Sequence, residues 1–268
     1  MMKNILLTIE YDGTQFAGWQ RQPQKRTVQG ELERVLSIVC RSAIQINGTS
    51  RTDAGVHALG QRASFKGEFG IPTERLMLAA NNILAGGMNS VGKVGDIRIL
   101  SAEEVQEDFH ARFDAKGKKY VYKILNCQET QIFSRNSCYQ VKEPLQVDKM
   151  REAAKYIVGK HDFKCFQASG GEEKKTTVRT IFALDISEYR DNGNRNNIEV
   201  QVIGDGFLYN MVRIIVGTLV DVGKGKIKPE YIKEIIDSKN RQIAGHTAPP
   251  QGLYLAKVYY NIEEITTV

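Results

Sequence analysis

The sequence lacks any long hydrophobic run. The longest apolar stretch, 208–222, is interrupted by Asn210, Arg213 and Asp221, whereas a membrane-spanning helix needs about 20 mostly apolar residues in a row. The N-terminus also lacks the apolar core and the small-residue cleavage site of a secretory signal peptide. We therefore expect a cytoplasmic protein without a membrane-spanning segment.

Cysteine is scarce, and its spacing does not suit a metal site. The four cysteines form no Cys-x-x-Cys pair, so we expect four free thiols: Cys40, Cys127, Cys138 and Cys165. The 24 glycines and 6 prolines show no period, which excludes a collagen-like chain. Hydrophobic residues make up 41% and charged residues 25%, the proportions of a globular protein rather than of a disordered one.

Charge of one sign is not in large excess. The 37 Lys and Arg residues outweigh the 31 Asp and Glu residues by a net charge of +6, which many enzymes have without binding nucleic acid. The basic residues gather, however, in four stretches that we expect to be loops: 21–26, 116–119, 174–179 and 224–228. Such clustering is typical of RNA or DNA binding, although four solvated loops explain it equally well.

The first hundred residues alternate strand-like and helix-like patterns. The apolar pattern predicts strands at 3–11, 43–47, 56–66 and 91–100. Apolar residues at helical spacing predict one helix from Val28 to about Arg41, with Thr27 as its N-cap, and a second helix from Pro72 to Leu84. The resulting order is β-α-β-β-α-β.

The second part of the chain repeats this order with one added helix. The patterns predict strands at 112–126, 178–190, 197–204 and 253–260, and helices at 148–158, 208–222 and 229–238. Each half therefore matches the order of the ferredoxin-like fold. We predict an α+β protein with two ferredoxin-like domains, residues 1–104 and 105–268, whose mixed or antiparallel sheets form a shared central cleft.

A polar loop between two expected strands is the main candidate site. Residues 48–58 read Gly-Thr-Ser-Arg-Thr-Asp-Ala-Gly-Val-His-Ala, and such small residues let a ligand or another backbone approach closely. Arg51 favours the ionised form of Asp53 nearby, and an ionised carboxylate can act as a nucleophile or a base. The alternative is that Asp53 only forms a hydrogen bond within its own turn.

Residues 51–58, Arg-Thr-Asp-Ala-Gly-Val-His-Ala, resemble the signature of the TruA family of tRNA pseudouridine synthases. Six further stretches resemble that family in the same order along the chain: Tyr11–Gln22, Thr27–Gln29, Asp108–Phe113, Lys119–Tyr122, Met211–Gly217 and Gly252–Leu255. Together with the signature, these stretches are distributed along the chain from about residue 5 to residue 260.

The resemblance implies an isomerase that converts uridine to pseudouridine in the anticodon stem-loop of tRNA, typically at tRNA positions 38, 39 and 40. It implies a homodimer that uses no cofactor and no metal. By motif, Asp53 is the catalytic aspartate, and Arg51 is a catalytic-site residue of the same loop that lies beside the extruded nucleotide. Tyr120 matches the active-site tyrosine, Arg213 matches the arginine that pairs with the aspartate, and Leu253 lines the pocket.

The residue types suit this chemistry. The reaction exchanges the N1–C1′ bond for a C5–C1′ bond without a change of oxidation state, and a carboxylate can assist by attacking the sugar or the base. Tyr120 can stack on the base and remove the C5 proton, or it can simply pack in a core. Arg213 lies in an apolar helix. If it points inward it needs an anionic partner such as Asp53; if it points outward it is a surface arginine.

RNA contacts are expected at basic and polar residues, because the target uridine must be extruded from its stem-loop and the phosphates must be held. The candidates are Arg21, His57, His110, Arg112 and Lys118; the two histidines can equally be ordinary polar surface. One departure from the family pattern is Thr49-Ser50, where Ala-Gly is common before Arg51. It leaves Arg51 and Asp53 in place but puts the local geometry of the loop in question.

Two other classes of function stay open at this point. A non-catalytic RNA-binding module can stack bases on the aromatic residues of ferredoxin-like sheets, but it does not need the loop of Arg51 and Asp53. A small-molecule enzyme with an aspartate nucleophile makes the basic loops incidental. Fold alone does not separate these classes, whereas tRNA binding and turnover do.

Overall fold

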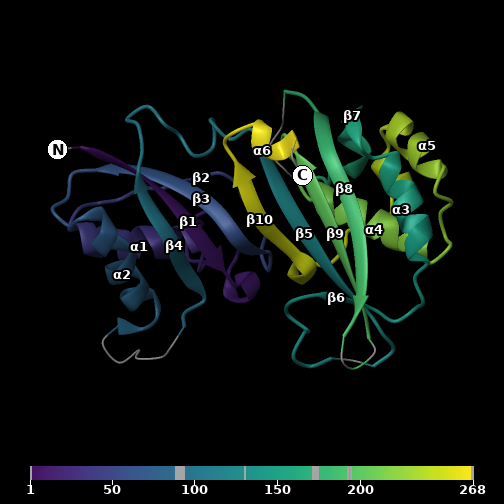
Figure 1. Ribbon diagram of the computed structural model, residues 1–268, viewed down its shortest axis with the longest axis horizontal. Helices are drawn as coiled ribbons and strands as arrows, with labels where there is room; N and C mark the ends of the chain where they lie inside the picture. The colour runs from purple at the N-terminus through teal and green to yellow at the C-terminus, as the bar shows by residue number, and fades with distance from the viewer. Residues whose placement is uncertain are drawn as a thin grey trace. The chain divides into compact units, whose positions relative to one another are not determined.

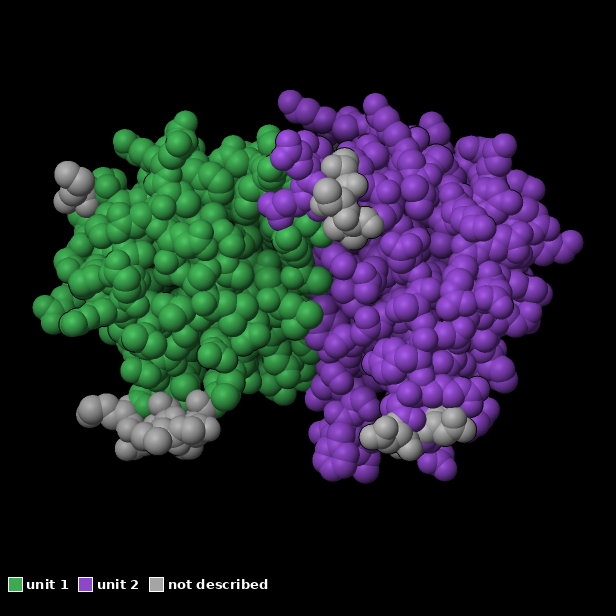
Figure 2. Space-filling view, in the orientation of Figure 1, with its two compact units in different colours: residues 1–116, 255–261 green, residues 117–254, 262–268 purple. Residues whose placement is uncertain are grey.

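The computed structural model describes residues 2–87, 94–129, 131–170, 175–191, 193 and 195–266. The chain divides into two compact units (Figure 2): unit 1 is residues 1–116 and 255–261, and unit 2 is residues 117–254 and 262–268. Both units combine helices and strands (Figure 1), which confirms the α+β class. The domain bounds 1–104 and 105–268 stay a prediction.

Unit 1 contains an antiparallel sheet. Its strands are β1 (Lys3–Tyr11), β2 (Asn47–Gly48), β3 (His57–Gly67) and β4 (Ile97–Glu104). β1 lies between β4 and β3, and the short β2 pairs with β3, so the order is β4-β1-β3-β2. Residues 255–259 of the last strand, β10 (Leu253–Tyr259), also belong to this unit and lie beside β3.

Two helices complete unit 1. They are α1 (Val28–Cys40) and α2 (Thr73–Leu84). The hydroxyl of Thr27 accepts a hydrogen bond from Gly30 N–H at 3.3 Å, as expected of an N-cap. The apolar faces of the helices and the central strand supply the core, whose members include Leu32, Val35 and Leu36 of α1, Leu76 of α2, and Ile5, Leu7 and Ile9 of β1.

Unit 2 contains a mixed sheet. Its strands are β5 (Gly117–Asn126), β6 (Tyr139–Val141), β7 (Gly159–Asp162), β8 (Val178–Arg190) and β9 (Asn196–Gly204). The order β5-β9-β8-β7 is antiparallel throughout, and β6 runs parallel to β5. Tyr120, Tyr122 and Ile124 of β5 are all buried and pair with alternate residues of β9.

The helices of unit 2 are α3 (Val147–Lys155), α4 (Met211–Gly223), α5 (Tyr231–Ser238) and α6 (Glu263–Thr266). α4 is buried along nearly its whole length, except at Arg213 and Asp221, as expected of a helix that is apolar on all sides. No helix within the described residues is long and apolar enough to cross a membrane.

The predicted elements are largely confirmed, but the strand at 43–47 is wrong over most of its length. The backbone N–H of Ile44 donates to Ser37 Oγ at 3.0 Å, and that of Ile46 donates to Glu33 Oε1 at 3.1 Å. These two acceptors lie on α1, so helix side chains take the place of a strand partner. Only Asn47 of the predicted segment is in a strand.

Other bounds also differ. The strand predicted at 91–100 begins at Ile97, and residues 91–93 lie outside the described part of the chain, as does residue 174 of one basic stretch. The strand predicted from residue 112 begins only at Gly117, because the N–H groups of Phe113 and Asp114 donate to the carbonyl of His110 and close a turn. The short strands β6 and β7 were not predicted.

Candidate active site

The loop between β2 and β3 carries Arg51 and Asp53. Burial alternates along it: Ser50 and Thr52 are buried, whereas Arg51 is exposed and Asp53 is half-buried. The uncharged residues therefore attach the loop to unit 1, and the two charged side chains lie on its more open side.

Buried neutral groups hold the loop on both sides of Arg51. Gln61 of β3 is fully buried; its Oε1 accepts from Ser50 N–H at 3.2 Å, and its Nε2 donates to the Ser50 carbonyl at 2.7 Å. Thr52 Oγ1 lies 2.7 Å from the hydroxyl of Tyr11, and the Thr52 carbonyl accepts from Trp19 N–H at 3.0 Å. These bonds fix the backbone from which Arg51 and Asp53 project.

The far end of the loop packs against Gly13. A Cβ atom at this position would lie 2.0 Å from the carbonyl oxygen of Val56, so only glycine fits. Gly13 N–H donates to Nδ1 of His57 at 3.1 Å, and the same nitrogen lies 3.2 Å from Asp12 Oδ1. His57 is buried and holds the turn, and its contact with RNA stays a prediction.

Asp12 caps the short helical turn that begins at Gly13. Burial alone would raise the pKa of Asp12, but hydrogen bonds from the hydroxyl and the N–H of Thr14, together with the nearby His57, outweigh it and leave the pKa lowered. The turn that contacts the loop is therefore held by an ionised carboxylate at neutral pH.

Thr49 and Ser50, the two residues that depart from the family pattern, are both buried. Thr49 Oγ1 lies 2.9 Å from the carbonyl oxygen of Ala111 and 3.0 Å from that of Arg62. Ser50 Oγ is buried and has no hydrogen-bond partner among the residues that the structure describes. The departure thus adds a bond to a distant loop at Thr49 and an unsatisfied hydroxyl at Ser50.

The other RNA-contact candidates of unit 1 lie outside this loop. Arg21 is exposed and pairs with Glu33 at 3.3 Å, a surface contact of small energetic value. His110 is half-buried and Arg112 is exposed, both in the loop that follows β4. Their contact with RNA stays a prediction.

Tyr120, Lys118 and Leu253 lie in unit 2. Tyr120 is buried in β5 with its ring edge-on to Phe207 at a centroid distance of 5.1 Å, and Lys118 is half-buried on the same face of the strand. Leu253 is buried at the start of β10. Tyr122, two residues after Tyr120, donates its hydroxyl to the Pro249 carbonyl at 2.6 Å, and burial raises the pKa of this phenol.

Arg213 of α4 is half-buried, between the two orientations that the sequence left open. Its Nε donates to the Ala248 carbonyl at 2.7 Å, and a terminal nitrogen donates to Asn210 Oδ1 at 2.7 Å. The guanidinium is thus oriented by neutral acceptors of unit 2. Its predicted pairing with Asp53, which belongs to unit 1, stays a prediction.

The segment 245–248, which supplies the carbonyl acceptor of Arg213, contacts α4 at both of its ends. Gly245 N–H donates to Thr218 Oγ1 at 2.9 Å, and Ala248 N–H donates to the Arg213 carbonyl at 3.0 Å. A Cβ atom at Gly217 would lie only 1.8 Å from the carbonyl oxygen of His246. Helix and segment therefore touch backbone to backbone, which glycine alone permits.

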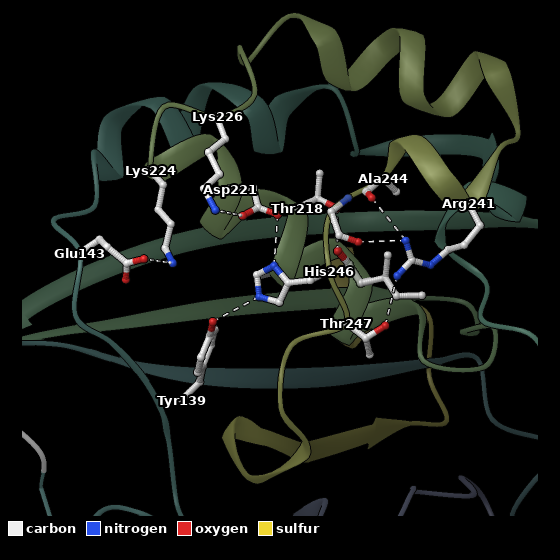
Figure 3. Close-up of polar contacts among 12 residues, drawn as sticks. Tyr139, Glu143, Thr218, Asp221, Lys224, Lys226, Arg241, Ala244, His246 and Thr247 are labelled. Atoms are coloured by element: carbon white, nitrogen blue, oxygen red, sulfur yellow. Dashed lines mark hydrogen bonds and ion pairs between the residues drawn. The ribbon is translucent and has the colours of Figure 1, made fainter.

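Charged and aromatic side chains fasten the same segment (Figure 3). His246 Nδ1 lies 3.1 Å from Asp221 Oδ2, and its Nε2 lies 3.2 Å from the hydroxyl of Tyr139. Arg241 donates to the Gly245 carbonyl at 2.9 Å and to Thr247 Oγ1 at 3.2 Å. Sequence patterns did not identify these contacts, because Tyr139 and Asp221 are 107 and 25 positions away from His246.

Within the described ranges, no group of three or more His, Cys, Asp or Glu side chains is placed to hold a metal ion. Burial raises the pKa of Cys40 to about 11 and that of Cys165 to about 12, so both groups are protonated thiols at neutral pH.

Known proteins resemble this chain over almost its whole length. Residues 7–114 and 153–261 match the family described as tRNA pseudouridine synthase. The chain is 50% identical to tRNA pseudouridine synthase A 2 of Clostridium perfringens. It is 46% identical to tRNA pseudouridine synthase A of Acetivibrio thermocellus and 44% identical to that of Thermoanaerobacter sp. strain X514. Each match covers 97% of this chain and 100% of the relative.

These matches place the chain in a class of enzymes, the isomerases that modify RNA. The chain belongs to the tRNA pseudouridine synthase family, whose members convert uridine in tRNA to pseudouridine. The predicted family and enzyme class are thereby confirmed, and a non-catalytic RNA-binding module is disfavoured.

Proposed function

We propose that this protein isomerises uridine in the anticodon stem-loop of tRNA, typically at positions 38, 39 and 40, with Asp53 as the catalytic carboxylate. The observation that carries the proposal is the loop of residues 50–53, in which buried neutral bonds at Ser50 and Thr52 hold the backbone that presents Arg51 and Asp53. A reacting group that is held in advance loses little freedom when the substrate binds.

The proposed reaction separates uracil from C1′, turns it and rejoins it through C5. Asp53 acts as the nucleophile, on the sugar or on the base, and Arg51 lies beside the extruded nucleotide. Tyr120 stacks on the base and takes part in the transfer of the C5 proton. Arg213 pairs with Asp53, and Leu253 lines the pocket. Atoms and electrons balance without a cofactor, because the product is an isomer of the substrate.

The tRNA contacts, the assembly and the finer fold are part of the same proposal. We expect Arg21, His57, His110, Arg112 and Lys118 to contact the anticodon stem-loop. The order β4-β1-β3-β2 in unit 1 and the antiparallel run β5-β9-β8 in unit 2 support two ferredoxin-like halves. The shared central cleft is an expectation from the sequence. A cytoplasmic homodimer completes the proposal.

Tritium release from tRNA labelled at C5 of its uridines tests the role of Asp53. We expect release by the wild type and none by Asp53→Asn, whose tRNA affinity stays within about twofold because the neutral amide keeps the shape of the loop. Asp237→Asn, at an exposed position on α5, is the matched control and retains full release.

Two outcomes contradict the proposal in different ways. Substantial release by Asp53→Asn shows that this carboxylate is not required for the chemistry. No release by the wild type, with tight tRNA binding intact, shows that this chain is an RNA-binding module on that substrate.

A further inference from the structure

The turn that follows β4 presents an aromatic ring to solvent. Phe113 is 75% exposed, although the backbone around it is well bonded. The N–H groups of Phe113 and Asp114 both donate to the His110 carbonyl at 3.1 Å, and Asp114 accepts from His110 N–H at 2.7 Å. The phenylalanine therefore stands on a formed turn, where exposure of its apolar surface costs free energy that a partner can recover.

Buried polar groups fasten this turn to unit 1. The side chain of Asn4 donates to the carbonyls of Gln106 at 2.8 Å and Phe109 at 2.9 Å. Ala111 is fully buried, and its carbonyl accepts from the hydroxyl of Tyr260 at 2.9 Å. Burial raises the pKa of Tyr260, so the phenol keeps the proton that it donates at neutral pH. The position of Phe113 is thus determined by the core beneath it.

His110 and Arg112 lie beside the ring of Phe113, which remains mostly exposed. The His110 ring lies 4.2 Å from that of Phe113, centroid to centroid, with an interplanar angle of 35°. His110 Nδ1 accepts from Arg112 N–H at 3.1 Å, which orients the imidazole and leaves its proton on Nε2. The guanidinium carbon of Arg112 lies 5.9 Å from the centroid of Phe113, within the range of a cation–π contact.

We propose that Phe113, together with His110 and Arg112, is a stacking platform for an unpaired nucleobase of the RNA substrate. An exposed aromatic face beside a guanidinium is the combination with which proteins hold unpaired bases, since the ring stacks on the base and the cation attracts the neighbouring phosphate. Phe113 is a binding residue that the sequence motifs did not assign. The identity of the RNA rests on the proposed function.

The platform is coupled to the loop of Asp53 through Thr49. The hydroxyl of Thr49 lies 2.9 Å from the Ala111 carbonyl, and Thr49 immediately precedes Ser50, where the loop begins. Both segments belong to unit 1. A base stacked on Phe113 is therefore held at a constant offset from Asp53, and the nucleotide concerned lies in the same stem-loop as the target uridine. Thr49 is a positioning residue in this account.

Binding to RNA stem-loops tests the platform. Phe113→Leu keeps an apolar side chain but removes the ring, and Phe133→Leu makes the same change at a fully exposed position in unit 2. We measure Kd for an anticodon stem-loop and for a series in which one unpaired nucleotide at a time is abasic. We expect Phe113→Leu to raise Kd about tenfold, and Phe113→Tyr and Phe113→Trp to restore it. Phe133→Leu leaves Kd unchanged.

The abasic series identifies the stacked base. At one position the abasic RNA binds wild type and Phe113→Leu equally, because the interaction is already absent. A tenfold loss that persists with every abasic RNA, or no loss at all, overturns the platform. A change in the oligomeric state of Phe113→Leu with unchanged Kd shows instead that the ring contacts another protein chain. Tritium release by the wild type is scored separately, so failure of the proposed function is distinguishable.

Thr49→Val tests the coupling, because valine keeps the volume of threonine without its hydroxyl. We expect kcat to fall about tenfold while Kd for the stem-loop stays within twofold, and Thr49→Ser to restore kcat. If Thr49 has only a structural role, Thr49→Val lowers the melting temperature, and kcat does not fall while Kd stays the same. Unchanged kcat in Thr49→Val overturns the coupling.

Discussion

Each unit fastens one polar segment, and the two use opposite chemistry. In unit 1 the loop of Arg51 and Asp53 is held at Ser50 and Thr52 by uncharged groups, the amide of Gln61 and the phenol of Tyr11. In unit 2 the segment 245–248 is held in large part by charged side chains, Arg213, Asp221 and Arg241. Both segments also rest on a glycine that lets two backbones touch, Gly13 in unit 1 and Gly217 in unit 2.

The difference follows from what each segment carries. Neutral anchors fix the loop of unit 1 without placing a further charge beside Asp53, and buried neutral bonds respond little to salt. The segment of unit 2 supplies backbone carbonyls, and charged anchors suit it because a charge-assisted hydrogen bond to a carbonyl is stronger than a neutral one. Solvent screens those anchors where they are partly exposed.

The largest expected effect comes from the feature that the two regions share. Gly13→Ala and Gly217→Ala each drive a methyl group into a carbonyl oxygen, at 2.0 and 1.8 Å. We expect each to lower the free energy of unfolding by about 3 kcal/mol. Urea denaturation measures it. Gly70→Ala, where no atom lies within 4 Å of the added carbon, is the control, and wild-type stability in either variant would show that the backbones can separate without cost.

A smaller effect distinguishes the two kinds of anchor. Gln61→Met keeps the volume but leaves the N–H and the carbonyl of Ser50 without their buried partner, so we expect a loss of about 2 kcal/mol. Because the lost bonds are neutral and buried, the same loss is expected in low and in high salt. Denaturation at two ionic strengths checks this, and a strong salt dependence would contradict the neutral account of unit 1.

The smallest effect is expected at His246, whose side chain is partly exposed. His246→Asn shortens the link between Asp221 and Tyr139, and we expect a loss of about 0.5 kcal/mol that shrinks as salt is added. The same two denaturation series measure it. A loss as large and as independent of salt as that of Gln61→Met would remove the contrast between the two regions.

Local sequence patterns predicted those elements whose apolar periodicity or capping residue is visible among neighbouring residues. The strands at 3–11 and 178–190 have their predicted bounds, and α1 begins after its Thr27 cap. The strand predicted at 43–47 was wrong because Ser37 and Glu33 take the N–H groups of Ile44 and Ile46. The alternation of apolar residues at 43–47 is the same whether the backbone bonds to a neighbouring strand or to helix side chains, so the pattern could not distinguish the two.

The candidate site divides in the same way. The pattern located the loop of Arg51 and Asp53, since a cluster of small, polar and charged residues between strands is visible in one dimension. Gln61 was not identified, because a buried glutamine in β3 reads as one more polar residue of a strand. Phe113 was not singled out either, since its exposure depends on how Asn4 and Tyr260, both distant in sequence, hold the turn around it.

The sequence by itself determined the family, the class of reaction and most of the helices and strands, because motifs and periodicity are properties of neighbouring residues. Only the tertiary structure decided which groups hold the loop of Arg51 and Asp53. The hydrogen bond between Tyr11 and Thr52 joins residues 41 positions apart in the chain, and the one between Thr49 and Ala111 joins residues 62 positions apart. Such bonds form because buried polar groups must find partners when water is removed, and the partners available depend on the folded arrangement alone.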